Sequence, residues 1–70
     1  MPKVRLYHNN KIILHQDINL SSSQKHYLHN VMRIKKGQDI LIFDDNKEYL
    51  AKVVNENCFT VSPKKFVREN

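Results

Sequence analysis

The chain has 70 residues, enough for one small domain and too few for a nucleotide-binding α/β domain or a (β/α)₈ barrel. Hydrophobic residues make up 40% and charged residues 27%, a balance typical of a globular protein and not of a disordered one. Twelve lysines and arginines against seven acidic residues give a formal net charge of +5, which favours polyanionic partners, nucleic acid first.

Three features bear on the compartment of the protein and on membranes. Cys58 is the only cysteine, so no internal disulfide is possible and the sequence predicts a reducing, cytoplasmic setting. The longest apolar runs, at residues 12–14 and 40–43, are far too short to cross a bilayer. Residues 1–5 are followed by no apolar block of the kind that signal peptides carry. We therefore expect neither a membrane segment nor a membrane partner.

The N-terminal third carries weak structural signals. Residues 4–8 are predicted to be extended, and Asn9-Asn10 is typical of a turn. Two β-prone pieces follow at residues 12–14 and 18–20, separated by three polar residues. The pattern leaves open whether these pieces are short strands or loop.

The region after the serines at positions 21–23 has the clearest helical pattern. A serine oxygen there can accept a hydrogen bond from a free N–H of the first helical turn. Leu28, Val31 and Met32 follow at helical spacing. Gly37 lies where a helix would end in a left-handed residue. We predict one helix over residues 22–34.

The C-terminal half is predicted to be a meander: a strand at 39–43, a turn at 44–47, a strand at 48–55, a turn at 55–57 and a strand at 58–67. Apolar residues on both faces of strand 39–43 predict that it is central and buried on both sides. Pro63 predicts an edge or a strand end within the last strand. The whole pattern predicts one mainly β domain over residues 1–70, a small barrel capped by one α-helix.

Motifs for catalysis and metal binding are weak. Cys58 lacks the surroundings of an activated thiol, so an inert core residue is the simpler interpretation. His26 and His29 would share one helical face, but no ligand spacing of a structural zinc site accompanies them. Asp44 and Asp45 are adjacent in a predicted turn, where aspartate is favoured for local hydrogen bonds. We expect no catalytic residue and no metal ligand in this chain.

Nucleic-acid binding has more support. Basic side chains flank the start of the first extended segment and the end of the predicted helix, at Arg5, Arg33, Lys35 and Lys36. Arginine matches phosphate with a planar fork, and lysine acts as a point charge. Aromatic faces for base stacking are offered by Tyr7, Tyr27 and Tyr49. Two alternatives stay open: Arg33 as a partner of helix-end carbonyls, and the tyrosines as core or rim packing.

Three stretches of the chain together resemble a known family. They are Arg5-Leu6-Tyr7-His8, residues 26–38, and residues 40–44 followed by 48–51. In this order they resemble the N-terminal domain of the ribosomal RNA small subunit methyltransferase E family. Members of that family methylate N3 of one uridine in 16S rRNA and use S-adenosylmethionine. The resemblance covers nearly the whole chain, and its specific part is the spacing of Val31-Met32-Arg33, Gly37 and Phe43-Asp44.

The resemblance implies a fold and a role. The fold would be a PUA-like β-barrel that binds 16S rRNA in the small ribosomal subunit. In the family a larger knotted α/β domain follows, with the cofactor pocket and the dimer interface, and that domain is absent from this chain. The resemblance thus implies a chain that binds RNA without a cofactor and without catalysis. The full-length protein would use S-adenosylmethionine and form a homodimer.

The resemblance also implies particular RNA contacts. Arg5 and Arg33 match arginines of the family's motifs, and Gly37 matches the glycine after its helix. The full set of expected RNA-binding residues is Arg5, Tyr7, His29, Arg33, Lys35 and Lys36. The sequence departs from the family pattern at Tyr27, Asn30 and Asp45, where the family commonly has histidine, arginine and glycine.

Two alternative functions stay open. One is a free-standing RNA-binding barrel without a catalytic partner. The other is a protein-interaction module whose basic face serves solubility. Binding to RNA that weakens steeply as ionic strength rises would distinguish the first from the second.

Overall fold

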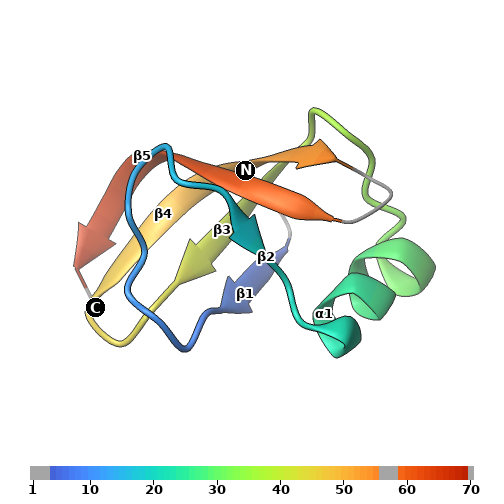
Figure 1. Ribbon diagram of the computed structural model, residues 1–70, viewed down its shortest axis with the longest axis horizontal. Coiled ribbons are helices and arrows are strands. Elements are labelled where there is room, and N and C mark those ends of the chain that lie inside the picture. The colour runs from blue at the N-terminus through green and yellow to red at the C-terminus, as the bar shows by residue number, and fades with distance from the viewer. Residues whose placement is uncertain (1–3, 56–58, 70) are drawn as a thin grey trace.

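The computed structural model describes residues 4–55 and 59–69 of the chain (Figure 1). The elements in those parts are β1 (Arg5–Tyr7), β2 (Ile18–Asn19), α1 (Ser22–His26), the π-helical turn η1 (Tyr27–Val31), β3 (Asp39–Phe43), β4 (Lys47–Asn55) and β5 (Thr60–Glu69). The predicted turn at residues 55–57 and the interpretation of Cys58 fall largely outside the described residues. Among the described residues, no helix combines the length and the apolar character needed to span a membrane.

The strands form one five-stranded sheet in the order β1-β3-β4-β5-β2. β1 runs parallel to β3, and every other neighbouring pair in this sheet is antiparallel. The consecutive strands β3, β4 and β5 are the predicted meander, which is confirmed. β4 begins one residue earlier than predicted, at Lys47, and β5 runs from Thr60 to Glu69 instead of from 58 to 67.

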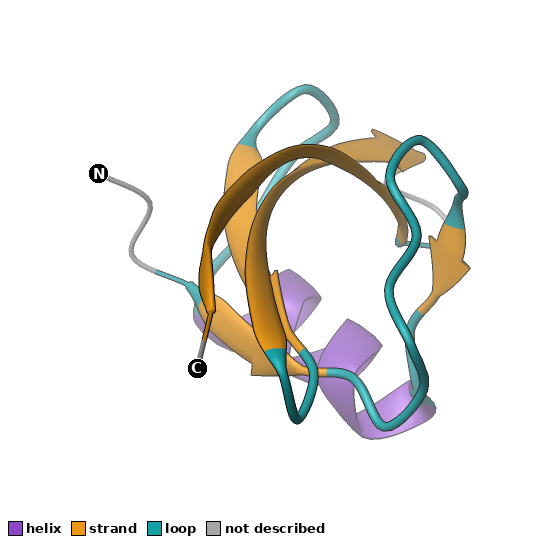
Figure 2. Ribbon diagram, turned by 90° about the vertical axis from the view of Figure 1, so that its left-hand side faces the viewer, coloured by secondary structure: helices purple, strands orange, loops and turns teal. Residues whose placement is uncertain are grey.

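The sheet curls until its strands wrap round a central core (Figure 2). Apolar side chains that alternate along the strands fill the inside, where β3 contributes Ile40 and Ile42, both fully buried. Leu28 of η1 is also fully buried and belongs to the same cluster. The helical segment therefore closes one end of the curled sheet. These features confirm the predicted small, mainly β barrel with a helical cap.

The outer face of β3 differs from its prediction. Leu41 and Phe43 point away from the core and are only half-buried. The prediction that β3 is central is right, because it lies between β1 and β4. The prediction that it is buried on both sides is wrong, because no layer of the described chain covers the outer face of the sheet (Figure 2).

The helical segment begins as the sequence predicts and ends earlier. The Ser21 hydroxyl accepts a hydrogen bond from the Gln24 N–H at 3.3 Å, and the Gln24 side chain accepts one from the Ser21 N–H at 3.4 Å. The end predicted at residue 34 is wrong, because Arg33 has a left-handed backbone with φ of 52° and the last helical residue is Val31. The Ile34 N–H bonds back to the Leu28 carbonyl at 2.9 Å and closes the helix end.

Gly37 has the predicted left-handed backbone at a different place in the fold. Its φ is 91°, and the Gln38 N–H donates to the Lys35 carbonyl at 3.1 Å across the turn. A turn with a positive φ at its third residue is of type II, which favours glycine there. Gly37 thus serves the turn that enters β3, and its predicted role as the end of the helix is wrong.

Two further predictions concern the β-prone pieces of the N-terminal loop and the place of Pro63 in the last strand. Of the two β-prone pieces, only Ile18–Asn19 forms a strand, whereas residues 12–14 are loop and Ile12 lies in the core. Pro63 lies within β5, so of the two predicted possibilities, an edge or a strand end, the edge is the one the structure has. Its carbonyl accepts from the His15 N–H at 2.8 Å, on the side of β5 where no strand of the described residues pairs with it. Because the missing N–H faces that same side, β5 continues past the proline as an edge.

Candidate nucleic-acid interface

The exposed side of β1 carries two of the six predicted RNA-binding residues. Arg5 and Tyr7 are two residues apart on this strand and therefore share its outer face, whereas Leu6 between them is buried. The Tyr7 ring lies 5.5 Å from the Phe43 ring, measured between centroids, and its hydroxyl donates to Asp45 Oδ1 at 2.9 Å. This hydrogen bond to Asp45, with lesser effects of burial and of nearby charge, raises the pKa of Tyr7.

A buried carboxylate on the same face holds Arg5. Glu48 Oε2 accepts from Arg5 Nε at 2.5 Å, and Glu48 Oε1 accepts from Arg68 Nε at 2.7 Å. Glu48 has no exposed surface, whereas the side chains of Arg5 and Arg68 are 47% and 64% exposed. The guanidinium carbon of Arg5 also lies 4.1 Å from the centroid of the Phe43 ring, which is the geometry of a cation–π contact.

The ionisation of Glu48 follows from these contacts. Burial alone would raise its pKa, but the hydrogen bonds and charges of Arg5 and Arg68 outweigh burial and lower the pKa below its ordinary value. Glu48 is therefore a carboxylate at neutral pH. Neither Glu48 nor Arg68 was predicted from the sequence to join this group, because they lie 43 and 63 residues from Arg5 and only the strand register brings them together.

The other four predicted residues lie on η1 and on the loop that leads to β3. His29 is exposed on η1, and its ring packs edge-on against Phe59 with centroids 6.1 Å apart. Arg33, Lys35 and Lys36 are exposed in the loop, so they offer positive charge to solvent within four residues of chain. The structure thus divides the six residues between β1 and the segment that runs from η1 to the start of β3.

The other candidates for stacking or metal binding lie on the helical segment and on β4. Tyr27 is 39% exposed on η1, but Tyr49 is buried against Phe66, so its prediction as a stacking surface is wrong. His26 Nδ1 lies 2.8 Å from the Asn30 amide nitrogen, which gives this histidine a partner on its own helix. Within residues 4–55 and 59–69, no three potential ligands gather to hold a metal ion.

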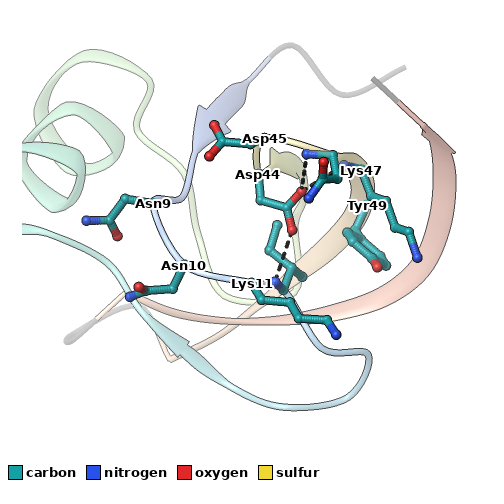
Figure 3. Close-up of a pocket in the computed structure, with 9 residues that line it drawn as sticks. Asn9, Asn10, Lys11, Asp44, Asp45, Lys47 and Tyr49 are labelled. Carbon is teal, nitrogen blue, oxygen red and sulfur yellow. Dashed lines mark hydrogen bonds between the residues drawn. The ribbon is translucent and has the colours of Figure 1, made fainter.

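A cavity of about 390 Å³ opens beside the β3–β4 turn (Figure 3). The Asp44 carboxylate next to it is nearly buried and accepts from the N–H groups of Ile12, Asn46 and Lys47 at 3.1, 2.8 and 2.7 Å. Burial raises its pKa, but these three hydrogen bonds outweigh burial and lower it below the ordinary value. Asp44 is thus a structural carboxylate that closes the turn, as its local hydrogen bonds were predicted to do.

Comparison with known proteins decides the family. The family model for the RNA methyltransferase PUA domain matches residues 20–61, more than half of the chain. The chain belongs to this family. No curated protein sequence matches the chain. The family match covers η1, the loop at residues 33–36 (the basic loop) and the buried Glu48, and it ends within β5.

Two solved structures share the fold of this PUA domain. A Legionella pneumophila protein described as a methyltransferase, solved with bound S-adenosylmethionine, has a TM-score of 0.84 and 23% identity. A ribosomal RNA small subunit methyltransferase E from Neisseria gonorrhoeae, bound to S-adenosylmethionine, has a TM-score of 0.72 and 20% identity. They match over 100% and 96% of this chain but only 30% and 28% of their own lengths. The chain therefore spans less than a third of either protein.

Proposed function

We propose that this chain is the rRNA-binding domain of an S-adenosylmethionine-dependent methyltransferase that acts on N3 of a uridine in 16S rRNA. The observation that carries the proposal is the match of the RNA methyltransferase PUA domain over residues 20–61. The fold shared with a ribosomal RNA small subunit methyltransferase E supports it. The sequence motifs that resemble the same family support it independently.

The proposed RNA contacts lie on the two exposed basic segments. Arg5 and Tyr7 of β1 would contact phosphate and base, and His29 of η1 would stack or donate a hydrogen bond. Arg33, Lys35 and Lys36 would bind phosphates, because their loop is exposed and basic. The net charge of +5 supports a polyanionic partner.

In this proposal the methyl donor binds outside the chain. Beside the cavity of Figure 3, the Asp44 carboxylate already accepts three backbone hydrogen bonds, so it serves the turn and not a ribose hydroxyl. No step of methyl transfer follows from this chain's own residues. Residues 1–70 would form one RNA-binding domain, and a knotted domain beyond it would supply the cofactor site and the homodimer contact.

The partner in this proposal is the small ribosomal subunit in the cytoplasm. A free-standing RNA-binding barrel and a protein-interaction module are the alternatives, and one experiment separates the three. The chain is crosslinked by ultraviolet light to isolated 16S rRNA, and the crosslinked nucleotides are mapped.

We expect crosslinks clustered around one uridine-containing site, and fewer crosslinks for the Arg5→Ala/Arg33→Ala variant. Crosslinks spread evenly along the RNA would favour a general RNA-binding barrel. A folded chain that forms no crosslink above the level of an acidic control protein would contradict RNA recognition altogether.

A further inference from the structure

The arrangement around Glu48 is unusual for the outer face of a sheet. That face is uncovered, yet the Glu48 side chain has no exposed surface, because Arg5 and Arg68 lie against it from β1 and β5. These two strands are not neighbours: β3 and β4 separate them. A single carboxylate on β4 thus holds two guanidiniums that belong to opposite ends of the chain.

The charge and the hydrogen-bonding capacity of this group favour an anion. Two arginines and one glutamate leave one net positive charge. Each guanidinium has five N–H donors, and each donates one of them, through Nε, to Glu48. Both side chains are about half or more exposed, so donors remain available to a ligand that approaches from solvent.

The aromatic residues beside Arg5 narrow the class of anion. The Phe43 ring lies under Arg5, and Tyr7 packs against Phe43 with 44% of its surface exposed. A tyrosine face beside a pair of guanidiniums suits a nucleotide, whose base stacks while its phosphate is bound in a fork.

We propose that Arg5 and Arg68 form a two-pronged phosphate-binding site for RNA and that Glu48 is the residue that positions them. This inference rests on the proposed function and deepens it, since it names one RNA contact site and adds Arg68 to the interface. Glu48 holds the two guanidiniums side by side before RNA arrives, which reduces the ordering that binding requires.

The decisive variant is Glu48→Gln. It gives opposite changes in RNA affinity depending on whether binding is governed by the overall net charge or by the positioning of Arg5 and Arg68. The change raises the net charge by one, so binding governed by overall charge becomes tighter. If Glu48 positions the arginines, binding becomes about tenfold weaker despite the added charge. Asp39→Asn is the matched control, since Asp39 pairs with Lys52 at an exposed site and its loss changes the charge equally.

A second pair of variants keeps the test valid if Glu48→Gln fails to fold. Arg68→Gln and Lys64→Gln each remove one positive charge from β5, and both side chains are exposed. We expect about tenfold weaker binding for Arg68→Gln and less than about threefold for Lys64→Gln. Binding is measured by fluorescence anisotropy with a labelled single-stranded 16S rRNA fragment, and folding by thermal unfolding.

Each outcome decides between the two proposals. Wild-type binding together with equal affinities for Arg68→Gln and Lys64→Gln would overturn the Arg5–Glu48–Arg68 site and leave RNA binding intact. Absence of wild-type binding to any RNA tested would overturn the proposed function and this inference with it. Shifts of the Arg5 and Arg68 Nε–H resonances in a nuclear magnetic resonance titration with RNA would support the site directly.

Discussion

Asp44 and Asp45 are adjacent in sequence and differ in their surroundings. Asp44 is nearly buried and accepts three backbone hydrogen bonds, one of which ties Ile12 of the N-terminal loop to the β3–β4 turn. Asp45 is exposed and accepts from the Tyr7 hydroxyl. The first carboxylate therefore stabilises the fold, whereas the second orients a residue of the proposed interface.

We expect Asp44→Asn to destabilise the protein by about 1–3 kcal/mol at pH 7, because an amide nitrogen would face an N–H group that now meets a carboxylate oxygen. Urea unfolding measures the change. Asp45→Asn is the control, with an expected loss below about 0.5 kcal/mol at its exposed position. Equal losses for both variants would contradict the structural role of Asp44.

The lowered pKa of Asp44 also predicts how the stability of the protein depends on pH. Its folded-state pKa lies below the ordinary value of 3.8, so the unfolded chain binds the proton more tightly than the folded protein does. The stabilisation is complete above pH 3.8 and is lost as pH falls through the folded pKa. Glu48 acts in the same direction below its ordinary value of 4.5. Asp44→Asn should flatten the acid limb of a stability–pH curve, and an unchanged limb would contradict this assignment.

At the scale of elements, the π-helical turn and the residue after it define the start of the basic loop. The Met32 N–H donates to the Tyr27 carbonyl at 3.1 Å, five residues back, which is wider than α-helical spacing. Arg33 then takes a left-handed backbone that glycine adopts at much lower cost. A residue with positive charge thus occupies a position where stability alone would favour glycine.

We expect Arg33→Gly to stabilise the fold by about 1 kcal/mol and at the same time to weaken RNA binding, because it relieves the backbone and removes a phosphate contact. Arg33→Ala is the matched variant: it removes the same charge and keeps the left-handed strain. Chemical unfolding should show Arg33→Gly to be more stable than Arg33→Ala, whereas fluorescence anisotropy should give the two variants the same RNA affinity. Equal stability of Arg33→Gly and Arg33→Ala would contradict the strain at this position.

The sequence predicted an element correctly where neighbouring residues determine it, and wrongly where contacts distant in sequence determine it. The bounds of β3 were predicted from the sequence because its apolar run and flanking turns are local. The end of the helix was predicted wrongly because Ile34 continues the apolar spacing while a backbone bond to Leu28 decides the ending. The Glu48 site could not be predicted, since it depends on the register of four strands, which no short stretch of sequence specifies.

At the scale of the whole molecule, the curled sheet has two unlike faces. The inner face carries the apolar core, which Leu28 closes at the helical end. The outer face is uncovered and carries the Arg5–Glu48–Arg68 group together with Tyr7 and Phe43. The basic loop at residues 33–36 precedes β3, the strand that pairs with β1. Positive charge therefore lies at separate places, on the outer face of the sheet and on the basic loop, which suits an extended polyanion better than a compact ligand.

The salt dependence of RNA binding tests that view of the surface. Each phosphate contact on a single strand contributes about −0.7 to the slope of log affinity against log salt. Arg5 and Arg68 share one phosphate in the proposed site, and Arg33, Lys35 and Lys36 contact three more, which together predict a slope of about −3. The Lys35→Ala/Lys36→Ala variant should reduce its magnitude by about 1.4, whereas Lys11→Ala/Lys47→Ala, beside the cavity, removes equal charge and should change it less. A slope near zero for the wild type would favour a protein-interaction module whose charge serves solubility.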